Sequence, residues 1–149
     1  MNMTAKILST FFGAGYAPIA PGTFTSLLIV LLYRFYLVRL DWPIYLVLLL
    51  ILFFLGVYVS TRFARELNKE DPQIIVIDEV LGQMIPLFLI KPDWLLLAAA
   101  FVLFRLFDII KPFPVNKAEK FPQGWGIMMD DLVAGLYAGI IINIFLLLK

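Results

Sequence analysis

The sequence predicts an all-α fold, a small polytopic helical membrane protein of about five spans, in a single domain over residues 1–149. The chain is 62% hydrophobic and only 15% charged, whereas ordinary soluble domains carry roughly 25% charged residues. A chain of this length has too much surface to hide so much apolar side chain in a water-soluble core. Its long apolar runs do not alternate with polar residues, which argues against a strand-based barrel.

The first two predicted spans are Thr23–Leu40 and Trp42–Thr61. The first carries Arg34 and Arg39 near its far end, where long side chains can extend to the membrane interface. The second has no charged residue. Its centre, residues 46–55, favours membrane insertion by roughly 3–6 kcal/mol, and the whole segment is long enough to cross about 30 Å of hydrocarbon.

The third predicted span, Ile74–Ile90, is unusual because it contains Asp78, Glu79, Gln83 and Pro86. It covers about 26 Å at ~1.5 Å per residue, which is slightly short for a membrane. A lipid-facing helix would not tolerate these polar groups, and a soluble helix would not need this apolar length. We therefore expect a helix packed inside a helical bundle.

The fourth predicted span, Trp94–Ile110, is interrupted by Arg105 and Asp108, and the fifth, Leu132–Leu148, is uncharged. Alternation of the spans distributes the basic residues unequally between the two sides of the membrane. The richer side is predicted to be cytoplasmic and the C-terminus external. That richer side holds Lys6, Arg62, Arg65, Lys69, Arg105, Lys111, Lys117 and Lys120, and the other side holds Arg34, Arg39, Lys91 and Lys149.

The composition also limits the chemistry. The chain has no His and no Cys, which excludes histidine- or cysteine-ligated zinc, thiol nucleophiles and imidazole catalysis. Phosphatases that form phosphohistidine or cysteine-phosphate intermediates are excluded for the same reason. The net charge of +1 argues against binding nucleic acid or other polyanions. Carboxylates, hydroxyls, Lys, Arg or an oxygen-ligated metal remain as the available chemistry.

Carboxylates from three separate segments map to the cytoplasmic ends of the predicted spans: Asp78, Glu79, Asp108, Asp130 and Asp131. If they converge near Arg105 and Lys111, the cluster carries a charge of about −3, which a hard divalent cation such as Mg²⁺ would offset. Two simpler interpretations stay open. Asp130 or Asp131 would then cap the last helix, and Arg105 and Asp108 would form an ion pair within one helix.

The segment from Ala17 to Ser26 contains two prolines and a glycine and leads into the first span. We expect Thr23 to be the N-cap there, with Gly22 and Ser26 beside it. A helix N-terminus with free N–H groups, hydroxyls and no acid is suited to binding an anion such as phosphate. The alternative is a rigid turn that only caps the helix.

Two stripes of small and polar residues lie on the third and fifth predicted spans. Glu79, Gly82, Gln83 and Pro86 form the first, and Asp131, Gly135, Gly139 and Asn143 form the second. Gly135 and Gly139 are typical of a close helix-packing face, either within the bundle or between subunits.

Three blocks of the chain resemble the phosphatidylglycerophosphatase A family. They are Gly15–Ser26 (GYAPIAPGTFTS), Asp71–Gln83 (DPQIIVIDEVLGQ), and Phe104–Pro114 (FRLFDIIKPFP) continuing to Gly126–Gly135 (GIMMDDLVAG). They occur in the family's order over most of the chain. The family usually has Gly where this chain has Thr25, and Gly-Gly where it has Gln123-Gly124.

The resemblance implies a Mg²⁺-dependent phosphatase that converts the lipid phosphatidylglycerophosphate to phosphatidylglycerol at the bacterial inner membrane. In the resulting hypothesis, Mg²⁺ is bound by Glu79, Asp108, Asp130 and Asp131. Asp78 is a further ligand or a base, Arg105 and Lys111 hold the phosphoryl group, and Gly22, Thr23 and Ser26 contact the phosphate.

Two other functions stay open. A small cation transporter would also use intramembrane carboxylates and a proline-interrupted helix. A transport path, however, should place ionisable groups through the depth of the bilayer, and here only Gln83 and Asn143 are expected to lie deep. The other possibility is a non-catalytic subunit of a membrane complex, for which converging carboxylates would have no purpose.

Overall fold

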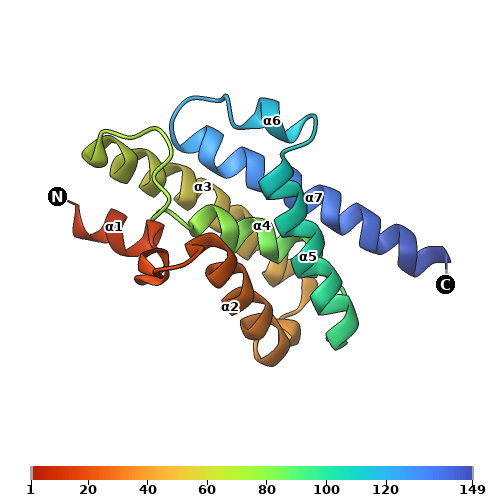
Figure 1. The fold of residues 1–149 in the computed structure, drawn as a ribbon. Helices are drawn as coiled ribbons and strands as arrows, with labels where there is room; N and C mark the ends of the chain where they lie inside the picture. Colours follow the sequence, from red (N-terminus) through yellow and green to blue (C-terminus); the bar gives the residue numbers. More distant parts are fainter. Residues whose placement is uncertain (1, 149) are drawn as a thin grey trace.

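The computed structural model describes residues 2–148, in which all regular secondary structure is helical and no strand occurs. Figure 1 shows the helices gathered into one bundle with the two termini at opposite ends. The predicted all-α class is confirmed. In chain order the elements are α1 (Met3–Ser9), η1 (Ala14–Tyr16), α2 (Pro21–Phe35), η2 (Leu37–Arg39), α3 (Trp42–Leu67), α4 (Ile77–Leu87), α5 (Trp94–Ile110), α6 (Val115–Ala118) and α7 (Gly124–Leu148).

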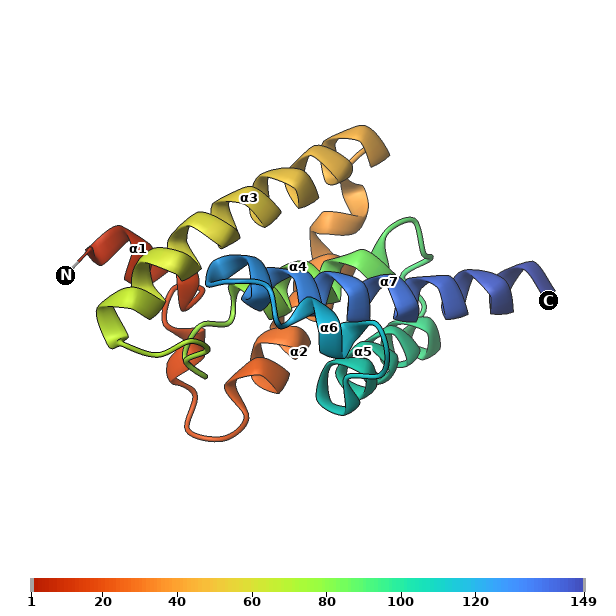
Figure 2. The ribbon, with the colours of Figure 1, turned by 90° about the horizontal axis from the view of Figure 1, so that it is seen from above.

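Helix α4 occupies the centre of the bundle, with α2, α3, α5 and α7 packed around it (Figures 1 and 2). Nine of its 11 residues are buried, including Asp78 and Gln83. The predicted helix inside a bundle is thus confirmed, but it is shorter than Ile74–Ile90. Residues 74–76 form part of the preceding loop, where the N–H of Val76 donates to the carbonyl of Ser9. At ~1.5 Å per residue, α4 covers only about 16 Å.

Two helices, α3 with 26 residues and α7 with 25, are long and apolar enough to cross a membrane. Helix α5 matches the predicted 94–110 segment, and α2 ends at Phe35, earlier than expected. The predicted number of about five membrane spans is therefore not confirmed. Helix α3 ends later than the predicted span, and α7 begins earlier than the predicted span. Hydropathy marks only the apolar part of a helix, whereas the helix itself ends where its backbone is capped. The left-handed residue Asn68 ends α3 in this way.

Helices α4 and α7 approach closely through their glycines. A Cβ atom placed on Gly135 would lie 2.4 Å from the carbonyl oxygen of Gly82, so neither backbone leaves space for a side chain there. One turn further on, Gly139 lies against Pro86. The two predicted small-residue stripes thus face each other, and the packing interpretation is confirmed within the chain. This contact fixes the position of the acidic residues that both helices carry.

The C-terminal part of α7 projects beyond the other helices in both views (Figures 1 and 2). Apolar side chains are exposed around this part of the helix: Ile140, Ile141, Ile144, Phe145, Leu147 and Leu148. The N-terminal part of the same helix is packed against α3, α4 and α6, with Ile127 and Met128 buried in one hydrophobic cluster. The acidic residues of α7 are therefore on its enclosed part.

Candidate active site

Carboxylates from three helices meet at one end of the bundle. Asp78 and Glu79 lie in the first turn of α4, Asp108 near the end of α5, and Asp130 and Asp131 in α7. Within residues 2–148 they form two groups whose carboxylate oxygens lie within 4.8 Å of one another. We call Asp78, Glu79 and Asp131 the α4 triad, and Asp108, Asp130 and Asp131 the α5 triad. The predicted convergence of all five residues is confirmed.

These carboxylates do not serve as helix caps. Helix α7 begins at Gly124, so Asp130 and Asp131 lie well inside it, and the interpretation of either residue as an N-cap is wrong. Both are nearly inaccessible, with 5% and 2% of their surface exposed. Asp78 and Glu79 instead lie in the first turn of α4, where the helix dipole stabilises negative charge.

Several buried carboxylate oxygens of the cluster accept no hydrogen bond from any described residue: Asp78 Oδ1, Glu79 Oε2 and Asp131 Oδ2. Buried polar atoms normally have a partner, so orphaned oxygens in a close group call for a ligand. Hard divalent cations such as Mg²⁺ prefer oxygen ligands of this kind. The donor set therefore fits such an ion.

Arg105 lies between the two triads. Its Nη1 is 2.6 Å from Asp108 Oδ2 in the α5 triad and 3.9 Å from Glu79 Oε1 in the α4 triad. The ion pair with Asp108 within one helix is thus present, as the simpler interpretation expected. The same guanidinium also faces an acid from another helix, which an ion pair confined to α5 does not explain.

Lys111 ends α5 in a left-handed conformation and reaches the opposite edge of the cluster. Its Nζ donates to Asp130 Oδ2 at 2.8 Å and to Glu119 Oε2 at 2.6 Å. Burial alone would lower the pKa of Lys111, but these two carboxylates outweigh that effect and raise it. Lys111 is therefore a fixed positive charge at the edge of the site.

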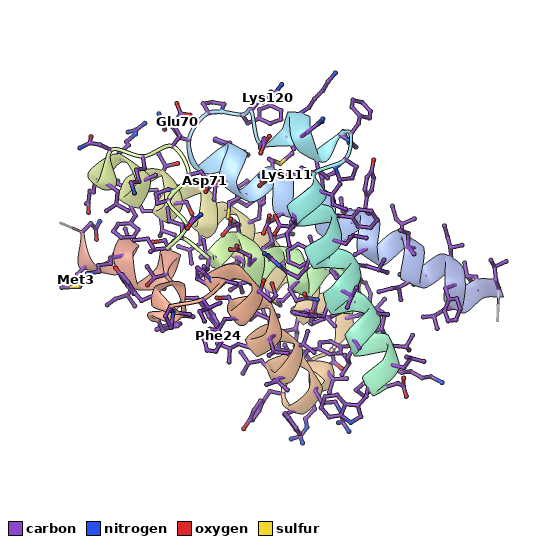
Figure 3. The ribbon with its side chains drawn as sticks, viewed as in Figure 1. Met3, Phe24, Glu70, Asp71, Lys111 and Lys120 are labelled. Atoms are coloured by element: carbon purple, nitrogen blue, oxygen red, sulfur yellow. The ribbon has the colours of Figure 1, made fainter. Side chains whose placement is uncertain are left out.

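Two acidic residues near the site were not identified from the sequence. Glu119 follows α6 and binds Lys111 directly. Asp71 lies in the α3–α4 connection, where partial burial raises the pKa of its carboxyl and the positive charge of Lys111 opposes that shift. Figure 3 shows Asp71, Lys111 and Lys120 on the same side of the bundle. Asp71 belongs to the second block of the family resemblance, whereas no pattern marks Glu119.

A cleft of about 860 Å³ opens beside the cluster. It is lined by the end of α3, the segment 68–71, the segment 119–123 and the start of α7, and it extends as far as Asp130. Charged residues of both signs line it, among them Arg65, Lys69 and Glu119. Of the five carboxylates, Asp130 is the one that lines this cleft, so the cleft reaches the α5 edge of the acidic cluster.

The N-terminal loop also reaches the cluster, although its details differ from prediction. Helix α2 begins at Pro21 with Ala20 as N-cap, so Thr23 lies in the first turn and is not the cap. A Cβ atom on Gly22 would lie 2.1 Å from Glu79 Oε1, which places the start of α2 against the α4 triad. Ser26 and Thr25 are fully buried, and their hydroxyls have no hydrogen-bond partner among the described residues.

Gln123, at which the sequence departs from the family that it resembles, has a positive φ of 58°. Glycine adopts this conformation without steric cost, which gives a physical reason for a glycine at this position. In this chain the side chain of Gln123 instead accepts a hydrogen bond from Arg65 Nη2 at 2.5 Å, across the cleft.

The family model of phosphatidylglycerophosphatase A matches residues 7–146. A Haemophilus influenzae protein named phosphatidylglycerophosphatase A is 39% identical over 91% of this chain and 85% of its own length. The Escherichia coli protein of that name is 36% identical over 95% and 83%. A Bacteroides thetaiotaomicron protein named "Putative phosphatidylinositol-3-phosphatase" is 38% identical over 93% and 91%. No solved structure matches the chain significantly.

The family match extends over nearly the whole chain and includes the segments that carry all five carboxylates, Arg105 and Lys111. The relatives are each covered over more than four fifths of their length. Among the described residues, α3 and α7 are long and apolar enough to cross a membrane. The chain belongs to the phosphatidylglycerophosphatase A family and is an enzyme that hydrolyses a phosphomonoester.

Proposed function

We propose that this enzyme removes the terminal phosphate of phosphatidylglycerophosphate in a Mg²⁺-dependent reaction, releasing phosphatidylglycerol and inorganic phosphate. The observation that carries the proposal is the pair of carboxylate triads, flanked by Arg105 and Lys111, in a chain of this family. A lipid phosphomonoester is a suitable substrate because the cluster supports a cation and the two basic side chains can contact an anion.

Each residue of the cluster has a proposed role. Glu79, Asp108, Asp130 and Asp131 hold Mg²⁺, which in such sites offsets phosphate charge and lowers the pKa of a bound water. Asp78 is a further ligand or accepts a proton from the attacking water. Arg105 and Lys111 bind the phosphoryl oxygens, since both already lie at the edges of the cluster.

The start of α2 is proposed to contact the phosphate as well. Gly22 lies against Glu79, and Thr23 follows it in the first turn of the helix. The free N–H groups of that turn are suited to an anion. Ser26 lies in the next turn, buried behind them, and its contact with phosphate stays a prediction.

We further propose a multi-pass arrangement in the bacterial inner membrane with the site at the cytoplasmic face. The end of α3 and the start of α7 lie together beside the site, where the N–H of Gly124 donates to Thr61 Oγ1. The basic residues Arg62, Arg65 and Lys69 cluster at that end of α3, which supports a cytoplasmic position. The acyl chains of the substrate would then stay in the bilayer.

The name of the Bacteroides relative suggests a second substrate, an inositol lipid with a phosphate at the 3-position. Both lipids present a phosphomonoester on a head group beside a membrane. The cluster itself would serve either one, so head-group selectivity is a property to be measured.

A cation transporter is less well supported. The carboxylates of the two triads meet at one end of the bundle and do not continue along it. Away from the triads, Gln83 is buried and neutral, and the exposed Asn143 on the projecting part of α7 donates a hydrogen bond to the carbonyl of Gly139. These residues do not form a path of ionisable groups across the bilayer.

The decisive experiment is an assay of phosphate release by the purified protein in detergent or vesicles. It compares phosphatidylglycerophosphate with phosphatidylinositol 3-phosphate, each with Mg²⁺ and with a chelator. We expect faster release from phosphatidylglycerophosphate and loss of release with the chelator. Release that persists with the chelator would refute the proposed Mg²⁺ dependence. Faster release from the inositol lipid would identify that lipid, and not phosphatidylglycerophosphate, as the preferred substrate. No release by folded protein would refute the proposed function.

A further inference from the structure

We infer that the site binds two divalent cations, one in each triad, with Asp131 as a ligand shared between them. The inference deepens the proposed function, on which it rests, by specifying how many ions the chain holds and which residues hold each. Its basis is the separation of the five carboxylates into two groups that have only Asp131 in common.

The geometry assigns each triad to its own pair of helices. Two residues of the α4 triad are adjacent in α4, and the α5 triad combines Asp108 with adjacent Asp130 and Asp131 of α7. Within each triad the ligand atoms are close enough to share one ion. Arg105 Nη1 lies near an outer member of each group, 2.6 Å from Asp108 Oδ2 and 3.9 Å from Glu79 Oε1.

The unpartnered oxygens support an ion in the α4 triad independently. Asp78 Oδ1 and Glu79 Oε2 are buried and have no donor among the described residues, and the same is true of the shared Asp131 Oδ2. In the α5 triad, by contrast, Arg105 binds Asp108 and Lys111 binds Asp130. The nearest cation to the α4 triad is Arg105, whose Nη1 lies 3.9 Å from Glu79 Oε1, farther than the 2.6 Å that separates it from Asp108 Oδ2.

The charge of the whole cluster also favours two ions. With Glu119, which contacts Lys111, six carboxylates lie beside two basic side chains and the net charge is about −4, so one divalent ion leaves about −2 and two leave about 0. A phosphomonoester brings a charge of about −1.5 to −2 at neutral pH. A site left at about −2 would repel this group, whereas a site that two ions neutralise would not.

The two ions are not equivalent in this arrangement. The α4 triad has less positive charge nearby, so we expect it to bind its cation more tightly. The α5 triad, already partly neutralised by Arg105 and Lys111, should fill at higher cation concentration. Asp131 contributes to both sites and therefore couples them.

The test uses Mn²⁺ as the probe, because it replaces Mg²⁺ at oxygen ligands and is paramagnetic. The full-length protein in detergent is stripped with a chelator and titrated with Mn²⁺ by calorimetry and electron paramagnetic resonance. We expect two Mn²⁺ per chain at saturation, binding in two steps, with a spectrum of two magnetically coupled ions. One Mn²⁺ per chain would overturn the inference, as would two ions without magnetic coupling.

Variants identify the ligands of each step. Asp78→Asn should remove the tighter binding step and Asp108→Asn the weaker one, so that each variant binds one Mn²⁺ per chain. Asp131→Asn should abolish the magnetic coupling. Glu70→Gln is the matched control, because Glu70 lines the neighbouring cleft but belongs to neither triad. The Glu70→Gln variant should bind Mn²⁺ in the same two steps as the unmodified protein. Loss of either step in this variant would overturn the assignment of the two ions to the two triads.

The outcomes separate this inference from the proposed function. Metal-dependent phosphate release by protein that binds a single Mn²⁺ would support the proposed function and overturn the inference of a second ion. Two coupled Mn²⁺ ions in protein that releases no lipid phosphate would support the paired site and refute the function. Circular dichroism of each variant verifies that the helices are retained.

Discussion

Helix α3 exposes Leu46, Val47, Leu50, Ile51 and Phe54 on its outer surface, whereas the shorter α4 encloses polar Asp78 and Gln83 at the centre of the bundle. In a soluble protein these preferences would be reversed, with the apolar helix inside and the charged one in contact with water. The reversal is explained if hydrocarbon surrounds α3 and an ion or substrate supplies the polar partners of α4.

The difference shows that hydrophobicity alone does not locate the functional part of this chain. An acidic side chain facing lipid costs about 2.5–3.5 kcal/mol at the centre of a bilayer. Inside the bundle the same side chain can be compensated by Arg, Lys or a cation. The least apolar helix is therefore the one that the others must surround.

The largest expected effect comes from removing a carboxylate of this enclosed region. Asp130→Asn should reduce phosphate release to below detection, because it removes a charge that both Lys111 and the proposed cation contact. The measurement is release from phosphatidylglycerophosphate at saturating Mg²⁺. Asp93→Asn is the control, since Asp93 caps α5 at its other end. An active Asp130→Asn enzyme would remove Asp130 from the ligand set.

A substitution on α3 tests the other side of the comparison. Leu50 is 53% exposed, so Leu50→Asp would place a charge in lipid at a cost of about 2.5–3.5 kcal/mol. We expect less protein in the membrane fraction and a lower melting temperature in detergent. Leu50→Phe should leave both unchanged. Equal behaviour of the two variants would show that this face of α3 does not contact lipid.

The contact between α4 and α7 can be tested with a pair of glycines. Gly135→Ala places a methyl group 2.4 Å from a backbone oxygen of α4, whereas at Gly139 the nearest atom, Pro86 Cα, is 3.5 Å away. Gly135→Ala should destabilise the fold by about 1–3 kcal/mol, as overpacking does. Gly139→Ala should have little effect. Thermal unfolding in detergent measures both, and equal melting temperatures would contradict this close approach.

A smaller effect is expected at Glu119, which positions Lys111 against Asp130. Glu119→Gln should weaken Mn²⁺ binding by about 10-fold, because outer partners of metal ligands commonly contribute 10- to 100-fold. Glu119→Asp should restore part of the affinity. Calorimetry with Glu70→Gln as control separates the contact from a general loss of charge. If Glu119→Gln and Glu70→Gln weakened Mn²⁺ binding equally, Glu119 would act only through its charge and not through its contact with Lys111.

Most residues of the candidate site could be named from the sequence because the chain has few acidic residues and no His or Cys. The sequence correctly predicted that carboxylates of three helices converge, and that the glycine stripes pack within a bundle. It failed at the ends of helices. Thr23 is not the cap of α2, and α7 begins at Gly124 instead of Leu132, because caps depend on backbone conformation and hydropathy does not report it.

The sequence by itself determined the helical class, the family and the inventory of charged groups, since these follow from composition, periodicity and motifs. Only the tertiary structure decided how those groups are paired. It separated the five carboxylates into two triads that share Asp131, placed Arg105 between them and brought Glu119 to Lys111. These relations depend on the distance and rotation between helices, which close packing at Gly82 and Gly135 sets.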